Sequence, residues 1–439
     1  MKARLIPVYF PGGRDAAFDN QMQALASLLM EKAELLPPVP LGSHIPEADA
    51  VIFPQMLGDA YRHVEDLRRI SLPMLVVTSE SATFSMWDWE IISYLKGQGI
   101  DVIAPYDVRH TRVLCGALAL KRALRTVKFI VYQDNPGVGA QANIFKRFYW
   151  WEDECVERIR RKFGITVERR SFRELSRRAE NVSDVEALKA WESRRVPTHG
   201  LSQEALLPAM KLYLAIKADS QEDKAVRAIG INCLNESHFS RTTPCLAWDL
   251  LFEDQRILWG CEADVVSMVT EYILYHSLES PVVMTNLYPF LMGDAALKHE
   301  RIDHFPPVPD DPANYVLVAH CGYMGLMPRK FATKWMLRKR VLKIVHEDSV
   351  AIDAELPLGP MTLAKLHPDF ATLTAGEGEL VKYVGYPGSD CLNGGLIRVA
   401  DGHRLMRMLC SHHAVLLPGK HLPEVHCLCK VFELDLEQI

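Results

Sequence analysis

Two acidic side chains stand at the start of a strongly apolar segment, in the stretch "GCEADVVSMVT". After Glu262 and Asp264, apolar side chains recur at the spacing of one helix face, which predicts a helix that begins close to both acids. A carboxylate in the first turn stabilises a helix through its dipole by about 0.3–1 kcal/mol, which explains one of the two acids. The functional alternative is a carboxylate that reaches into an active site, because α/β proteins gather such residues where a strand passes into a helix.

Two further motifs suggest ligand sites but have the wrong spacing. The glycines of "NPGVGA" (135–140) match neither GxGxxG nor the P-loop, so we interpret them as a turn, and the chain has no dinucleotide fingerprint after its first strand. The tail "SHHAVLLPGKHLPEVHCLCK" holds four histidines and two cysteines. Cys427 and Cys429 are separated by one residue rather than the two to four typical of structural zinc, so we do not predict a zinc site there.

The overall composition is that of a globular protein, and the chain has no excess of basic residues that would favour binding to large anionic partners. Of the 439 residues, 49% are hydrophobic and 24% charged, and the net charge of −5 favours neither nucleic acid nor an anionic membrane. No stretch has the apolar length of a signal peptide core or a membrane span. The ten cysteines include no CxxC pair, so we expect free thiols and a cytoplasmic location.

Alternating strand and helix patterns organise the first two thirds of the chain. Residues 1–126 show short continuous apolar runs between amphipathic segments, which is typical of a doubly wound parallel sheet. A second α/β domain of the same kind is predicted over 127–290, with "PVVMTNL" (281–287) as its last parallel strand. Over 291–439, β-branched residues with frequent glycine and proline predict an antiparallel, barrel-like domain.

From about residue 228 onward the chain resembles the L-fucose/L-arabinose isomerase superfamily, in particular its shorter fucose isomerase-like branch. The order and spacing of several blocks carry this resemblance: "IGINCLNE" (229–236), "TTPCLAWDLL" (242–251), "GCEADVVSMVT" (260–270), "PVVMTNL" (281–287), "VAHCG" (318–322), "LPLGPMTLAKL" (356–366) and "SHHAVLLPG" (411–419). Residues 1–227 resemble the family only in their α/β alternation.

The resemblance implies an oligomeric aldose–ketose isomerase whose site holds a divalent metal ion, typically Mn²⁺. The family's metal ligands are a Glu, an Asp and a His, which fall on Glu262, Asn286 and His413 of this chain. Glu262 would also be the general base, and Asp264 is then left to cap the helix. His320 would contact a sugar hydroxyl, and His412 is the neighbour of the predicted ligand.

The chemistry of isomerisation explains these residue types. A proton moves between C1 and C2 of an open-chain sugar through an enediol, so carboxylates can remove and return it. A metal ion bound to the sugar oxygens stabilises the charge that develops on them. Oxygen ligands with one imidazole suit Mn²⁺ or Mg²⁺ better than zinc or copper.

Asn286 departs from the family pattern, because an amide has no charge and cannot accept the proton. Three explanations are open: another group such as Tyr288, Asp264 or Glu236 replaces the acid, the metal is absent or held differently, or the protein has left the isomerase reaction. The first predicts an active isomerase, and the last predicts a sugar-binding or regulatory paralogue without turnover. The loop 235–245 is expected to face the pocket, with Glu236 and Arg241 as candidate substrate contacts, although an arginine there is more often an ordinary surface residue.

Overall fold

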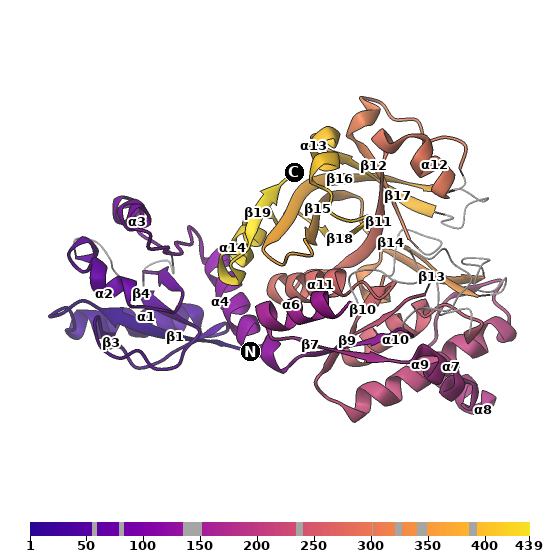
Figure 1. The fold of residues 1–439 in the computed structure, drawn as a ribbon, viewed down its shortest axis with the longest axis horizontal. Coiled ribbons are helices and arrows are strands. Elements are labelled where there is room, and N and C mark those ends of the chain that lie inside the picture. The colour runs from indigo at the N-terminus through magenta and orange to yellow at the C-terminus, as the bar shows by residue number, and fades with distance from the viewer. Residues whose placement is uncertain are drawn as a thin grey trace. The chain divides into compact units, whose positions relative to one another are not determined.

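The computed structural model describes residues 1–54, 59–78, 83–134, 152–233, 240–300, 302–320, 327–339, 349–385 and 393–439. The chain forms two compact units. The first comprises Met1–Leu124 with His276–Leu278 and Pro423–Leu434, and the second comprises Arg125–Tyr275, Glu279–Leu422 and Asp435–Ile439 (Figure 1). The division into 1–126, 127–290 and 291–439 stays a prediction. Within the described residues, no helix combines the length and the apolar character that crossing a membrane requires.

The first unit contains a parallel sheet in the order β2-β1-β4-β5, with β3 pairing onto β1. Its strands are β1 (Ala3–Tyr9), β2 (Ala33–Leu35), β3 (Val39–Pro40), β4 (Ala50–Phe53) and β5 (Met74–Val76). Its helices are α1 (Ala16–Leu29), η1 (Ala60–Arg62), α2 (Val64–Arg68), α3 (Asp88–Gly97) and α4 (Val108–Ala123). The short helix η2 (Leu124–Thr126) follows α4. Asp15 and Asp107 cap α1 and α4 by accepting backbone N–H bonds. Because the second strand lies outside the first, the sheet is doubly wound, as the alternating pattern predicted.

The second unit begins with another parallel sheet, in the order β10-β9-β6-β7. Its strands are β6 (Lys128–Tyr132), β7 (Thr166–Arg170), β9 (Val226–Ile231) and β10 (Leu258–Cys261), and the accompanying helices are α6 (Asp153–Phe163), α7 (Phe172–Glu180), α8 (Asp184–Glu192), α9 (Gln203–Glu222), α10 (Cys245–Gln255) and α11 (Val265–Leu278). Numbered within this sheet, the strand order is the same as in the first unit, so the prediction of two doubly wound parallel-sheet domains is confirmed.

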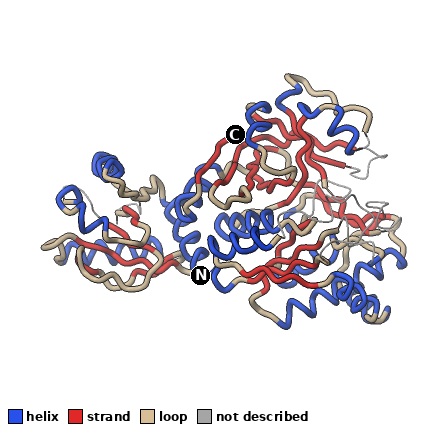
Figure 2. Tube along the Cα trace, viewed as in Figure 1, coloured by secondary structure: helices blue, strands red, loops and turns tan. Residues whose placement is uncertain are grey.

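Six antiparallel strands then close into a barrel. Their order is β15-β18-β11-β12-β17-β16, and a pairing between β15 and β16 completes the circle. Figure 2 shows the strands of the chain in red. The strands are β11 (Val283–Pro289), β12 (Tyr315–Ala319), β15 (Gly359–Leu366), β16 (Thr372–Gly385), β17 (Asn393–Val399) and β18 (His413–Pro418), and β19 (Asp435–Gln438) adds to β16 in parallel. The predicted antiparallel barrel near the C-terminus is therefore confirmed.

The remaining elements are short. In the second unit they are η5 (Phe290–Met292), α12 (Asp294–Glu300), η6 (Pro312–Asn314), η7 (Arg329–Phe331) and α13 (Gly402–Met408). The same unit has a small sheet of β8 (Thr198–His199), β13 (Lys334–Lys339) and β14 (Val350–Glu355) in the order β14-β13-β8. From Pro423 on, α14 (Leu422–Phe432) belongs to the first unit.

The prediction for "PVVMTNL" as a parallel strand is wrong. These residues form β11, which runs antiparallel to β12 and β18 inside the barrel. Every residue of β11 is buried, the polar Thr285 and Asn286 included, and a mostly apolar run of this kind does not distinguish a parallel strand from a covered barrel strand. The difference matters for the site, because it places Asn286 directly opposite His413 of β18.

Helix α11 joins the parallel sheet to the barrel. On one side its Met268 lies over Gly230 and Gly260, where an added Cβ would come within 3.0 Å and 2.4 Å of the Met268 side chain. On the other side its Thr270 hydroxyl accepts a hydrogen bond from the backbone N–H of Leu366 in β15 (3.2 Å). The N-terminal part of α11 is thus fixed between the two sheets, and this also fixes the positions of Glu262 and Asp264, which precede the helix.

Candidate functional site

Glu262 lies in a strained turn between β10 and α11. Glu262 and Ala263 have φ angles of 55° and 57°, in the left-handed region that residues with a side chain seldom adopt. Hydrogen bonds from Ala263 N to Gly260 O (3.2 Å) and from Asp264 N to Cys261 O (3.1 Å) hold the turn. The Glu262 side chain is only 5% exposed and lies at the carboxyl end of a parallel strand. Backbone strain held at such a place is typical of functional sites.

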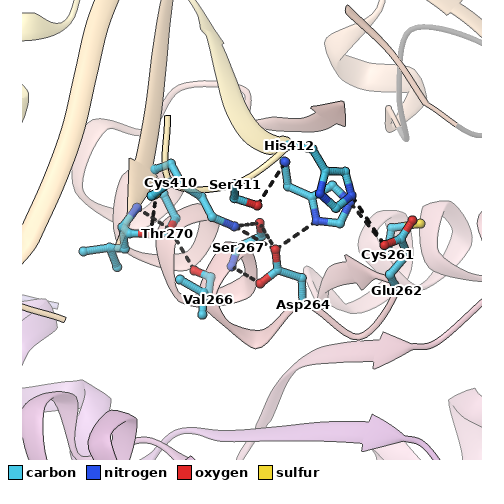
Figure 3. Close-up of polar contacts among 12 residues, drawn as sticks. Cys261, Glu262, Asp264, Val266, Ser267, Thr270, Cys410, Ser411 and His412 are labelled. Atoms are coloured by element: carbon cyan, nitrogen blue, oxygen red, sulfur yellow. Dashed lines mark hydrogen bonds and ion pairs between the residues drawn. The ribbon is translucent and has the colours of Figure 1, made fainter. Parts of the chain in front are cut away.

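Two histidines from the start of β18 meet the Glu262 carboxylate. The Nε2 atoms of His412 and His413 each lie 3.6 Å from Glu262 Oε2, and the two rings have centroids 4.0 Å apart (Figure 3). One ligand atom from each of the three residues fits within 4.8 Å of the others. His413 is fully buried, whereas 43% of the His412 side chain is exposed. The cluster therefore has the composition and spacing of a metal site that is open on the His412 side.

Asp264 caps α11 and also binds His413. Its Oδ1 accepts the backbone N–H of Ser267 (3.0 Å), which is the capping bond expected from the sequence. Its Oδ2 accepts from the Ser267 hydroxyl (2.8 Å), lies 2.7 Å from the Lys365 ammonium, and lies 2.9 Å from His413 Nδ1. Burial alone would raise the pKa of Asp264, but the Lys365 charge and the His413 contact hold it far below its usual value. Asp264 is therefore an ionised carboxylate that only accepts hydrogen bonds.

The two buried imidazoles of the site are neutral. Burial, with a smaller contribution from His412, lowers the pKa of His413 to about 4, although Glu262 and Asp264 oppose the shift. Burial and His412 also lower the pKa of His320 to about 3. An ionised Asp264 can only accept, so the 2.9 Å contact is a hydrogen bond when His413 carries a proton on Nδ1.

Asn286 and His320 line the same region from the neighbouring barrel strands. Asn286 of β11 pairs with His413 of β18 on one side and with Ala319 of β12 on the other. The His320 ring follows β12 and packs edge-on against His413, with centroids 5.5 Å apart. Asn286 Nδ2 donates to the Tyr288 hydroxyl (2.9 Å). Asn286 Oδ1 and His320 Nε2 are buried and have no hydrogen-bond partner among the described residues, which suits atoms that bind a ligand.

The remaining candidates from the sequence are not brought to this cluster by any described contact. Arg241 is exposed and adopts a left-handed turn (φ 58°) before α10, so its role as a substrate contact stays a prediction. Glu236 and the glycines of residues 135–140 lie outside the described residues.

Sequence reasoning missed His412 as a third side chain that could hold a metal ion, and it missed the contact of Asp264 with His413. It also missed Lys365, whose place in the apolar run "MTLAKLH" was the available signal, because lysine is almost never buried without a partner. No sequence motif indicates that α11, β15 and β18, which are far apart along the chain, meet at the Asp264 carboxylate.

Comparisons with known proteins leave the resemblance unsupported. No protein-family model matches the chain, and a search of curated proteins returned no significant match.

Proposed function

We propose that this protein is a metal-dependent aldose–ketose isomerase that acts on a monosaccharide or a sugar derivative. The observation that carries the proposal is the pair formed by Glu262 and His413. A carboxylate oxygen and an imidazole nitrogen, both of a kind that ligates metal ions, lie 3.6 Å apart in a buried site. The resemblance of this part of the sequence to sugar isomerases supplies the reaction class.

The residues fit a divalent cation. Ligand nitrogen and oxygen atoms lie about 2.1 Å from such an ion, so two ligands at ordinary angles are roughly 3–4 Å apart. The separations of 3.6 Å from Glu262 Oε2 to both imidazole Nε2 atoms lie in this range. Glu262, His412 and His413 would hold the ion, and Asn286 offers an amide oxygen beside them. The resemblance favours Mn²⁺, while two imidazoles and one carboxylate also suit softer divalent ions.

In the proposed reaction, Glu262 removes the proton from C2 of an open-chain aldose and returns it to C1, while the hydroxyl proton on O2 passes to O1, so that C1 becomes an alcohol and C2 a ketone. A bound cation would stabilise the negative charge that develops on the sugar oxygens. Asn286 and neutral His320 would hydrogen-bond the sugar hydroxyls, because each has a buried polar atom without a partner among the described residues. Asn286 cannot take up a proton, so Glu262 carries the acid and base roles that two carboxylates share in the family.

The test combines metal analysis with a substrate screen. Purified full-length protein would be assayed for bound Mn, Fe, Co and Zn, and then for ketose formation from pentoses, 6-deoxyhexoses and sulfosugars with each ion added. Glu262→Gln keeps the shape of the side chain and should abolish isomerisation. Unchanged turnover in that variant would refute the assignment of the base.

A second candidate function is a sugar-binding or regulatory paralogue without turnover, and Asn286 is the observation that favours it. Such a protein would show sugar-dependent thermal stabilisation without product. Asn286→Asp separates the two proposals, because activity gained in that variant would favour the paralogue, whereas activity lost would show that the amide is adapted to the reaction.

A further inference from the structure

We propose that Asp264, held by Lys365, is a positioning residue that fixes His413 in the tautomer able to bind a cation. The inference rests on the proposed metal site at Glu262, His412 and His413. It assigns to Asp264 a second role beyond the helix cap, and it gives the buried lysine of β15 a purpose in the same site.

The hydrogen bonds of Asp264 are divided between its two oxygens. Oδ1 accepts the Ser267 N–H and completes the helix cap. Oδ2 accepts from the Ser267 hydroxyl (2.8 Å), from Lys365 (2.7 Å) and from His413 Nδ1 (2.9 Å). The cap needs Oδ1 alone, so it does not explain why an ammonium group and an imidazole also converge on Oδ2.

The cost of burial argues that this convergence is functional. The side chains of Asp264 and Lys365 are 0% and 7% exposed, and removing two charges from water is expensive even when they pair. A serine, threonine or asparagine would cap the helix without requiring a buried lysine. A carboxylate paired with an ammonium differs from all of these in one respect, because it accepts hydrogen bonds and never donates one.

That property determines which nitrogen of His413 carries the proton. Nδ1 must donate to Asp264, and Nε2 is left with its lone pair toward Glu262 Oε2. The two acids of the "CEAD" turn therefore lie at opposite nitrogens of one imidazole. Ligating histidines in metal sites are commonly oriented through their second nitrogen by a carboxylate in this way.

The experiment reads the tautomer directly. Full-length protein labelled with ¹⁵N-histidine, stripped of metal and held at neutral pH, gives long-range ¹H–¹⁵N spectra that distinguish a protonated from an unprotonated ring nitrogen. The His413 signals are assigned among the 16 histidines by their loss in His413→Gln. Wild type should show Nδ1 protonated and Nε2 unprotonated, and the opposite pattern would overturn the proposal even if no Asp264 variant folds.

The double variant Asp264→Asn with Lys365→Met tests the cause. Lys365 and His413 contact the same oxygen, Oδ2, so an amide beside Lys365 would keep its oxygen there and leave the tautomer unchanged. Without Lys365, the Ser267 N–H holds the amide oxygen at the Oδ1 position, and the NH₂ group takes the place of Oδ2 and donates to His413 Nδ1, which moves the imidazole proton to Nε2. Affinity for added Mn²⁺ or Zn²⁺, measured by calorimetry, should fall by about 10- to 100-fold. A folded double variant with the wild-type tautomer and wild-type affinity would refute the positioning role.

Ser267→Ala is the matched control. It removes the hydroxyl that contacts both Asp264 Oδ2 and the Lys365 ammonium but keeps the ion pair and the contact with His413, so the tautomer and the metal affinity should stay close to wild type. A loss in Ser267→Ala as large as in the double variant would indicate a general structural effect and overturn the proposal. Because the tautomer is read without metal or sugar, wild type with the expected tautomer but no cation binding would refute the proposed function and leave the positioning of His413 standing.

Discussion

Replacing Lys365 with methionine isolates the energetic role of the buried ion pair. Methionine keeps most of the apolar length of lysine, but it leaves the Asp264 carboxylate buried without its cation. Breaking a buried pair by removing one partner costs about 3–5 kcal/mol. The carboxylate keeps its bonds to Ser267 and His413, so we expect the lower end, about 3 kcal/mol at neutral pH.

The loss should depend on pH in a defined direction. In wild type the pKa of Asp264 is held far below that of an aspartate in the unfolded chain, so the ionised group stabilises the fold at neutral pH. This contribution disappears only as the pH falls toward the low pKa of the folded state. Without Lys365, burial, which raises the pKa of Asp264, is opposed by His413 alone, so the pKa should lie above its wild-type value. The carboxyl group then takes up a proton as the pH falls, and the difference between Lys365→Met and wild type should shrink on acidification.

Urea unfolding followed by tryptophan fluorescence measures both effects. Trp248 and Trp259 are buried in α10 and β10, within the same unit as the site, and report its unfolding. Arg160→Met is the matched control, because Arg160 pairs with Glu157 in water on the surface of the same unit. That variant should leave the free energy of unfolding nearly unchanged.

The double variant Lys365→Met with Asp264→Asn decides whether the cause is the uncompensated charge. Removing both charges should recover part of the stability that Lys365→Met loses, with a coupling of about 0.5–3 kcal/mol. Losses that simply add in the double variant, or a Lys365→Met protein as stable as wild type at neutral pH, would refute the account of a tightly coupled buried pair.

Three further predictions concern other parts of the chain. Asn286→Asp adds a negative charge beside the proposed ligands and should tighten Mn²⁺ binding, measured by calorimetry on metal-free protein. Gly402→Ala would place a Cβ 1.7 Å from the Ala313 carbonyl oxygen and should cost at least about 1–3 kcal/mol in urea unfolding, whereas Gly97→Ala, with no atom within 4 Å of the new Cβ, should stabilise by about 0.4–1 kcal/mol. Burial would raise the pKa of Asp254, but hydrogen bonds from an arginine and a lysine lower it. The ionised Asp254 therefore stabilises the fold above about pH 4, and Asp254→Asn should be less stable than wild type there. This difference should vanish as the pH falls below about 4, and unfolding curves measured over a range of pH would show it.

The parts of the fold that could be predicted from sequence are those that local patterns determine. Continuous apolar strands between amphipathic helices predicted both doubly wound sheets, and the helix after Asp264 begins where its apolar stripe indicated. The β11 prediction failed because buried parallel strands and covered barrel strands share one pattern, and only the pairing with β12 and β18 distinguishes them.

The candidate site was predictable only in part, for a related reason. Glu262 and His413 were named from their sequence blocks, and the structure brings them within 3.6 Å of each other. The roles of Lys365 and Asp264 depend on contacts across about 100 and 149 residues of chain, respectively, and local spacing carries no information about such contacts.

The turn at Glu262 and Ala263 explains why two acids stand at the mouth of an apolar helix. Side chains two residues apart point to the same face of a strand, and on a helix they diverge by about 200°. Two successive left-handed residues adopt neither geometry, so Glu262 can reach one nitrogen of the His413 ring while Asp264 reaches the other. The strain of this turn is offset by a helix cap and by an ion pair that lie only one residue further along the chain. The apolar helix that follows supplies the rigid support, since α11 is held between the parallel sheet and the barrel and cannot shift without disturbing both.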